Sequence, residues 1–385
     1  MLRQILIVSA LNFKSLKSRF WQSMVIVVGL GATIGVLLSM MSLTEGMQKS
    51  YAHAGDPGRA IVVSKGADYE SQSTITRAMA PLIIDAPGIA KDKDGKPMAD
   101  RGLNMGLPIL RANGTKGYTT MRGFGSYGAA LRPEFQLVKG RMFEPGKREM
   151  IVGVSAQTLF QNMQIGDSVI LPDGAWPIVG VYTTGDILDG QVIGDTETML
   201  TALRRATYNT ILVRLASQES FDAFKKALTT NPALSVTVER HSDWYAKFSS
   251  QSTRFLVLMA YVVGIIMAIG ALFGCLNTMY AAVSTRAREI ATLRALGYGA
   301  FPVSVSVILE AVTLAAIGAL AGAAIAWLLN DGKSSTWGWN IFTLTVSPSL
   351  IGFGIFWAVG VALLGGLFPS IRAARRPVVE ALRAT

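Results

Sequence analysis

Long apolar runs interrupt an otherwise mixed pattern of hydrophobic and polar positions in this chain of 385 residues. One run lies near the start, and three lie close together in the last third. An α-helix needs roughly 20 apolar residues to cross the hydrocarbon core of a bilayer. The pattern therefore predicts four transmembrane helices, at residues 21–43, 253–280, 302–329 and 348–370.

The region between the first two spans, residues 44–252, reads differently. Short strand-like runs bounded by Gly, Pro or Asp dominate residues 118–205, and helical patterns lie on either side of them. The predicted fold class is a membrane α-helical protein with a large α+β domain inserted between helices 1 and 2. Helical patterns at Thr44–Gly55 and His241–Phe255 predict stalks that lead from the spans into this domain.

The distribution of charged residues predicts the orientation of the chain in the membrane. Only 16% of the residues are charged, whereas a soluble chain carries about a quarter, and the net charge is +11. Most of the excess lies in three flanks of the spans: Arg3, Lys14, Lys17 and Arg19; Arg286, Arg288 and Arg294; Arg372, Arg375, Arg376 and Arg383. The positive-inside rule places these flanks in the cytoplasm and the large domain outside. The basic composition thus reports membrane topology, which argues against nucleic-acid binding.

This topology divides the rest of the chain. Residues 1–20 are basic and amphipathic, which predicts a helix on the inner membrane surface. Residues 281–301 form a cytoplasmic loop, residues 330–347 a short periplasmic loop, and residues 371–385 a cytoplasmic tail.

A few positions inside the spans stand out. Glycines recur at four-residue spacing at Gly31 and Gly35, at Gly270 and Gly274, and at Gly318 and Gly322. Such pairs let helices approach closely, within one bundle or between two copies of the chain. Glu310 is a carboxylate inside the third span, where a structural pairing is favoured over ion transport, and Asn277 is a candidate for helix–helix hydrogen bonding.

The sequence shows no catalytic constellation. Cys275 is the only cysteine and His53 and His241 are the only histidines, so neither a disulfide nor a metal-ligand spacing is present. No G-x-x-x-x-G-K-[ST] motif occurs, so the chain lacks P-loop chemistry. We expect a non-catalytic membrane subunit with no cofactor and no metal of its own.

Two cytoplasmic motifs resemble the FtsX-like ABC permease family. The first is "TRAREIATLRALGYG", an arginine-flanked Glu-Ile followed by Leu-Arg-Ala-Leu-Gly after the second span. The second is "FPSIRAARRPVVEALRAT", in which Pro369 closes the fourth span and the tail motif contains Arg375, Pro377, Glu380 and Arg383. The outer domain resembles the MacB-type periplasmic core, above all at "FQLVKGRMFEPGKREMIVG" (Phe135–Gly153). Ala291 and Tyr298 depart from the family pattern, where glycine and a small residue are usual.

The resemblance implies several partners. It implies a separate ATPase subunit that binds ATP and Mg and docks from the cytoplasm, a second permease copy in a homodimer, and a membrane-fusion-type periplasmic adaptor. It also implies a multi-pass protein of the bacterial inner membrane with both termini in the cytoplasm.

The physical pattern of the first motif fits a coupling helix. Ile290, Leu293 and Leu296/Gly297 fall at helical spacing and form an apolar stripe, with Gly297 as a natural C-cap. The charged residues beside the stripe complete the predicted ATPase contact: Arg286, Arg288, Glu289 and Arg294. The alternative is a solvated loop that is basic only because of topology.

The spans look too few and too poor in polar residues to form a substrate channel. We therefore expect mechanotransmission: ATP hydrolysis in the partner moves the coupling helix, and the stalks rearrange the outer domain to drive export. One alternative is a regulatory transducer that controls a cell-wall hydrolase or senses antimicrobial peptides. A second is a lipoprotein-extraction permease. The sequence carries no signature of the substrate.

Overall fold

The computed structural model describes residues 4–5, 7–9, 20–338 and 340–375. The chain forms two compact units. The helical unit comprises residues 1–45, 254–333 and 345–385, and the sheet unit comprises residues 46–253 and 334–344. Most of the predicted surface helix at 1–20 and of the tail at 371–385 lies outside the described residues.

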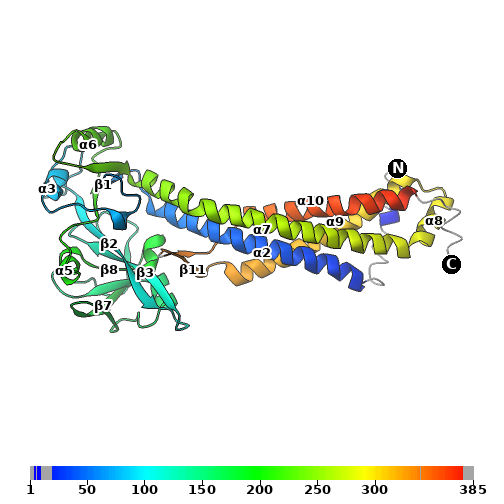
Figure 1. The fold of residues 1–385 in the computed structure, drawn as a ribbon, viewed down its shortest axis with the longest axis horizontal. Helices are drawn as coiled ribbons and strands as arrows, with labels where there is room; N and C mark the ends of the chain where they lie inside the picture. Colours follow the sequence, from blue (N-terminus) through cyan, green and yellow to red (C-terminus); the bar gives the residue numbers. More distant parts are fainter. Residues whose placement is uncertain (1–3, 6, 10–19, 339, 376–385) are drawn as a thin grey trace. The chain divides into compact units, whose positions relative to one another are not determined.

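Within the described residues, four helices are long and apolar enough to cross a membrane. They are labelled in Figure 1 as α2 (Phe20–Ala54), α7 (His241–Thr285), α9 (Ala300–Asn330) and α10 (Pro348–Arg375). Each contains a predicted span and extends beyond it. Helices α2 and α7 remain helical through the two predicted stalks, so both helices contribute residues to both units. The prediction that Pro369 ends the last helix is wrong. Helix α10 continues through Pro369 to Arg375.

Glycine contacts hold α2 against α9 inside the helical unit. A Cβ atom added to Gly31 would lie 2.9 Å from the carbonyl oxygen of Gly318, and one added to Gly322 would lie 2.1 Å from that of Gly31. Four of the six spaced glycines therefore serve packing within one chain. Gly270 and Gly274 on α7 differ, because nothing lies within 4 Å of a Cβ at either position.

The sheet unit contains one mixed sheet with the strand order β10-β1-β9-β2-β3-β8-β5-β7-β4, and β6 pairs with β7. The pairs β3–β8 and β5–β7 are parallel and the others are antiparallel. The strands are β1 (Arg59–Ser64), β2 (Ala99–Leu110), β3 (Lys116–Phe124), β4 (Gln136–Gly140), β5 (Met150–Gly153), β6 (Ser168–Leu171), β7 (Gly174–Thr183), β8 (Gln191–Asp195), β9 (Thr210–Arg214) and β10 (Val236–Arg240).

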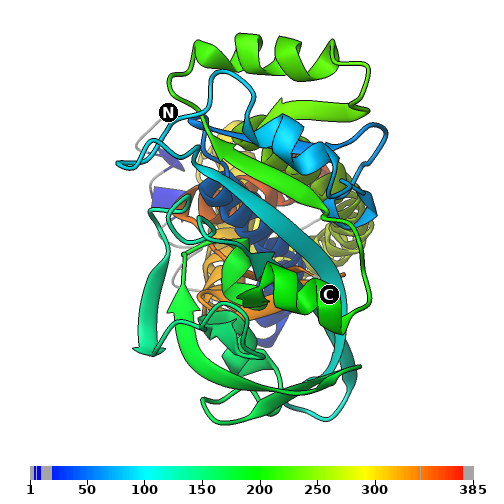
Figure 2. The same cartoon turned by 90° about the vertical axis from the view of Figure 1, so that its left-hand side faces the viewer.

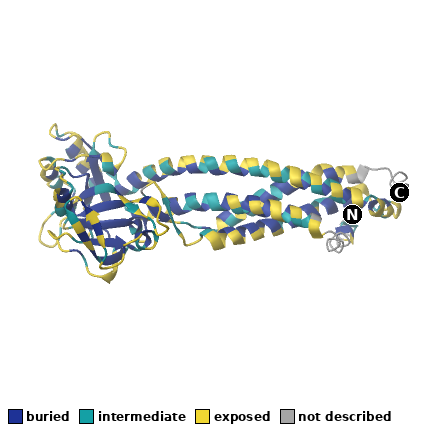
Figure 3. Ribbon diagram, turned by 60° about the horizontal axis from the view of Figure 1, so that its bottom comes forward, coloured by how far each residue is buried: buried dark blue, intermediate teal, exposed yellow. Residues whose placement is uncertain are grey.

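The long strand β2 joins the two halves of this sheet. Its first residues, Ala99–Gly102, pair with β9, and Leu103–Leu110 pair with β3. Strands β3 to β8 all lie within the predicted β-rich insert at 118–205 or at its edge. In Figure 2, which looks onto the sheet unit, α6 (Ser220–Thr229) lies beside β10. The amphipathic face of α6 buries Phe221, Phe224 and Leu228, and Figure 3 shows the strands as mostly buried.

Residues 334–343 depart from the sequence expectation of a plain loop. They form a β-hairpin of β11 (Ser334–Trp337) and β12 (Asn340–Thr343) that belongs to the sheet unit. Ile341 is 1% exposed in the core of this unit, and Nη2 of Arg111 donates to Oγ1 of Thr336 over 2.8 Å. The segment between the last two spans is therefore an integral part of the outer domain.

Candidate coupling site

A short helix occupies the loop between α7 and α9, as the first motif predicts. Helix α8 spans Ala287–Ala295, and Arg286, with φ −102° and ψ 6°, breaks the backbone between α7 and α8. Glu289 lies in its first turn and Arg294 in its last. These charges complement the helix dipole, which is positive at the N-terminus and negative at the C-terminus.

Gly297 ends α8 with a Schellman motif. Its φ is +93°, its N–H donates to the carbonyl of Arg294, and the N–H of Tyr298 donates to the carbonyl of Leu293, both over 3.1 Å. Glycine adopts this left-handed conformation without the steric cost that a Cβ atom brings. The predicted C-cap is thus present in the structure, and it gives α8 a defined end.

A buried ion pair ties the start of α8 to α9. Nη1 of Arg286 donates to Oε2 of Glu310 over 3.0 Å, and the two side chains are 8% and 7% exposed. Nε of Arg286 also donates to Glu289 over 3.3 Å. A buried charge is tolerated when an opposite charge and hydrogen bonds compensate it. Glu310 therefore has a structural partner within the chain, and the Arg286 side chain is buried in the helical unit.

The predicted apolar stripe is divided between two surfaces. Ile290 is 8% exposed and packs into the core of the helical unit with residues such as Met279 and Val303. Leu293 is half-buried, and Leu296 is 72% exposed. The stripe does not form one free ridge, because its first residue is used to seat α8 on the bundle.

The exposed surface of α8 carries the remaining candidate contacts. Arg288 and Glu289 are exposed, as is Leu296 at the end of the helix, whereas Arg294 is half-buried. The structure thus separates the predicted coupling residues into an anchoring set, Arg286 and Ile290, and an outward set, Arg288, Glu289 and Leu296. Sequence reasoning missed this division. The signal available to it was the carboxylate of Glu310 inside the span that follows an arginine-rich loop.

The structure describes only some of the other predicted site residues. Asn277 is exposed on α7. Arg375 is the last residue of α10, and the tail residues Pro377, Glu380 and Arg383 lie outside the described residues. Among the residues that are described, no group of three or more His, Cys, Asp or Glu side chains could hold a metal ion, and the Cys275 thiol is buried.

Comparison with known proteins agrees with this architecture. A family model described as the MacB-like periplasmic core domain matches residues 23–231, and one described as the FtsX-like permease C-terminal region matches residues 261–378. The first model alone covers more than half of the chain. The chain therefore belongs to the MacB-like periplasmic core domain family and is an ABC transporter permease of the MacB/FtsX type.

Individual relatives are distant. The macrolide export ATP-binding/permease protein MacB of Nitrobacter winogradskyi is 24% identical over 387 residues, which cover 91% of this chain and 56% of that protein. The protein of the same name from Chlorobium luteolum is 28% identical over 290 residues, 69% of this chain and 42% of that protein. The chain spans about half the length of these relatives. It is also similar to the uncharacterized ABC transporter permease YknZ of Bacillus subtilis, 28% identical over 131 residues, 33% of this chain and 31% of that protein.

Among solved structures, the extracellular domain of the noncanonic ABC-type transporter YknZ from Gram-positive bacteria aligns with 47% of this chain and 99% of its own length. The TM-score is 0.36 and the sequence identity is 16%.

Proposed function

We propose that this permease transmits the movement of a separate ATPase subunit to its periplasmic domain, and that α8 is the element on which the ATPase acts. The observation that carries the proposal is the buried Arg286–Glu310 pair. Together with Ile290, it fixes the inner face of α8 to the helical unit while the outward residues stay accessible. A helix held in this way would move as one piece with α9 when a partner pushes on it.

The proposed orientation follows from charge. Basic residues concentrate at the N-terminus, at α8 and after α10, so we place α8 and both termini in the cytoplasm of a bacterial inner-membrane protein. ATP and Mg would then be bound by the partner ATPase. Helices α2 and α7 run without interruption from their spans into stalk residues of the sheet unit, which provides two continuous connections to the outer domain.

The hairpin β11–β12 supplies a further connection. It is packed into the sheet unit through Ile341, and short segments on either side join it to α9 and α10. Displacement of any of the four helices would thus reach the outer domain through the chain itself. We propose that the result is export of a substrate with a periplasmic adaptor, carried out by a homodimer of this chain.

Site-specific cross-linking tests the ATPase contact. The full chain, with Cys275→Ser, is coexpressed with its ATPase subunit, and single cysteines are placed at Leu296, at the buried Ile290 and at Lys333 in the loop between the last two spans. A cross-link to the ATPase from position 296, but not from 290 or 333, is the expected result. Equal cross-linking from 296 and 333, or none from 296 in an intact complex, would refute α8 as the contact.

A further inference from the structure

The sheet unit contains a cavity of about 350 Å³ that the coupling mechanism does not use. Seven stretches of the chain line it: the end of α2, the 3-10 helix η2 (Glu70–Gln72) with the preceding Tyr69, strand β2, strand β3, the segment from η3 (Ile187–Gly190) into β8, the start of α7, and the hairpin β11–β12. All of these lie in the sheet unit. The volume falls in the range of small-molecule sites, which bury a ligand among apolar and aromatic groups with a few polar ones.

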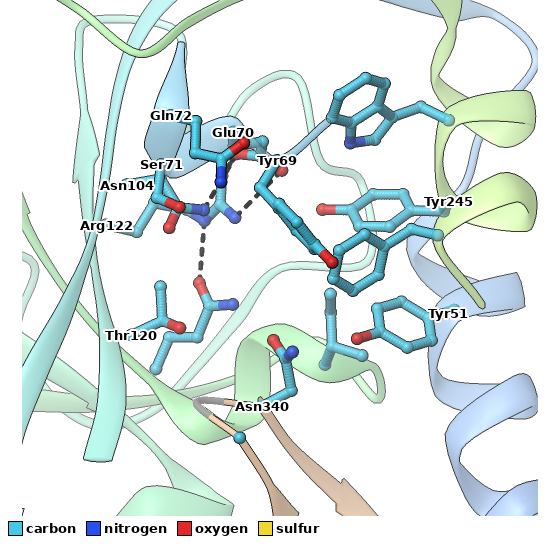
Figure 4. A pocket seen from close by; sticks show the side chains of 15 residues that line it. Tyr51, Tyr69, Glu70, Ser71, Gln72, Asn104, Thr120, Arg122, Tyr245 and Asn340 are labelled. Carbon is cyan, nitrogen blue, oxygen red and sulfur yellow. Dashed lines mark hydrogen bonds and ion pairs between the residues drawn. The ribbon is translucent and has the colours of Figure 1, made fainter. Parts of the chain in front are cut away.

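One wall of the cavity is aromatic. Tyr51 packs against Phe248 with ring centroids 5.2 Å apart, and Tyr69 packs edge-on against Phe248 at 5.3 Å. Tyr245 and Trp244 on α7 complete this wall. Figure 4 shows the Tyr245 and Tyr51 side chains reaching from their helices toward the space opposite Arg122. Aromatic rings offer large flat surfaces for an apolar or ring-shaped ligand, and their polar tips can hydrogen-bond.

The opposite wall is polar and electrically balanced. Nη1 of Arg122 donates to Oε2 of Glu70 over 2.8 Å, and its Nε donates to Oε1 of Gln191 over 2.8 Å. Nδ2 of Asn104 donates to the same Glu70 oxygen. Burial raises the pKa of Glu70, but the charge of Arg122 and the hydrogen bonds from Arg122 and Asn104 outweigh it and hold the pKa below its usual value. The wall therefore carries one negative and one positive charge that compensate each other.

Because the charges of Glu70 and Arg122 compensate each other, the cavity favours an uncharged ligand. A charged ligand buried here would find no free counter-ion on the Glu70–Arg122 pair, and an uncompensated buried charge is costly. A neutral ligand avoids that cost and still meets amide groups of Gln191, Asn104 and Asn340.

The Tyr51 hydroxyl is a buried polar group on a residue that lines the cavity. The Tyr51 side chain is 1% exposed, and its hydroxyl has no hydrogen-bond partner among the described residues. A buried polar group without a partner is unfavourable, so a site that leaves one unsatisfied usually has a reason. A ligand with a carbonyl or hydroxyl oxygen close to Tyr51 could accept its hydrogen bond.

We propose that this cavity binds an uncharged small molecule that combines a ring or other flat apolar face with hydroxyl or carbonyl groups. The flat face lies against Phe248 and the tyrosines, and the polar groups meet the Arg122 side. The ligand would touch α2, α7 and the hairpin β11–β12 at once, through their residues in the sheet unit.

Three compounds that share a nitrophenyl ring test the ligand class. They are 4-nitrophenyl-β-glucoside, which is neutral, 4-nitrophenyl phosphate, which is anionic, and 4-nitrophenethylamine, which is cationic. Each is dialysed to equilibrium against the full chain in lipid nanodiscs, with empty nanodiscs subtracted. We expect saturable binding of the neutral compound at one site per chain, with a Kd on the order of 0.1 mM or tighter, and at least about tenfold weaker binding of the charged ones.

Variants locate the site. Gln72 lines the cavity and is exposed, so Gln72→Trp should block the cavity with little risk to the fold. Phe248→Ala removes the ring at the centre of the aromatic wall. Each variant should weaken binding of the neutral compound about tenfold or more. Tyr51→Phe should weaken it about fivefold. The matched control is Tyr118→Ala, at an exposed tyrosine on β3 outside the cavity, which should bind as the parent chain does.

The proposal is overturned if the neutral compound does not bind above empty nanodiscs, if Gln72→Trp binds it as well as the parent chain does, or if a charged compound binds more tightly. No ATPase takes part in the measurement, so its outcome is independent of the proposed coupling function.

Discussion

The guanidinium of Arg286, between α7 and α8, lies 3.0 Å from the carboxylate of Glu310 on α9, and both side chains are buried. Loss of one partner from a buried pair costs about 3–5 kcal/mol, whereas replacing both with apolar residues can be nearly neutral. We expect Glu310→Gln and Arg286→Met each to lower the thermal stability of the chain in nanodiscs and to weaken ATPase stimulation. The double variant Arg286→Met/Glu310→Leu should recover much of the stability. Additive losses in the double variant would show that the two residues do not act as a pair.

Substitutions on the outward surface of α8 should impair coupling to the ATPase without destabilising the fold. Glu289→Lys reverses an exposed charge, and Leu296→Ser removes an exposed apolar contact. We expect both to reduce stimulated ATPase activity and complex assembly several-fold while the melting temperature of the isolated chain stays within about 2 °C. Leu82→Ser, at an exposed leucine of the sheet unit, serves as the control. Normal assembly and stimulation in both α8 variants would remove these residues from the contact.

Substitution of Gly297 tests whether its left-handed backbone conformation stabilises the end of α8, independently of any side-chain contact. Its φ of +93° disfavours any residue with a Cβ atom, although nothing lies within 4 Å of where that atom would be. Gly297→Ala should cost about 1–2 kcal/mol locally, whereas Gly297→Asn should cost less, since asparagine tolerates this conformation. Hydrogen exchange of the α8 amides measures the difference. Equal protection in the three chains would contradict the strain argument.

The raised pKa of the buried Asp100 carboxyl leads us to expect that the stability of the folded chain depends on pH. It is buried on β2, and burial raises its pKa from 3.8 to about 6, with Arg132 opposing the rise. Because the folded pKa is above the unfolded one, the native state holds the proton between about pH 4 and pH 6, and this contribution to stability is lost as the pH rises through that window. The shift corresponds to about 3 kcal/mol at pH 7.

Asp100→Asn keeps the neutral form at every pH. The melting temperature of this variant relative to the parent chain should therefore increase from pH 4 to pH 7. Asp68→Asn, at an exposed residue, is the control. Parallel melting curves for Asp100→Asn and the parent chain across this range would show that Asp100 does not titrate as described.

The spaced glycines distinguish packing within the chain from packing between copies. Gly322→Leu should destabilise the chain itself, because its backbone contacts Gly31. Gly270→Leu should leave the monomer stable, since the position is open, and should weaken the proposed homodimer if α7 forms its interface. Cross-linking yield and native mass spectrometry measure the dimer. An undisturbed dimer in Gly270→Leu would place the interface on another helix.

Local pattern was enough to predict the long helices and the short helix α8. Runs of apolar residues located all four spans, and helical spacing predicted both stalks and the short helix that ends at Gly297. These features depend on residues close together in sequence, whose backbone geometry and membrane length requirement apply before any tertiary contact forms. The large outer domain was predicted as a class, from the density of short strands.

The partners of individual side chains could not be predicted in the same way. Arg286 and Ile290 fit the pattern of an exposed coupling surface equally well, and only the packing of α8 on the bundle turned both inward. The hairpin at 334–343 looked like a loop because its pairing surface, which receives Ile341, is contributed by the outer domain more than a hundred residues earlier. The cavity likewise joins Glu70, Arg122 and Phe248 from three distant segments. By itself the sequence determined where each helix runs and which ends are charged. The tertiary structure decided which charges are buried and paired, because burial depends on the surface that a distant segment presents.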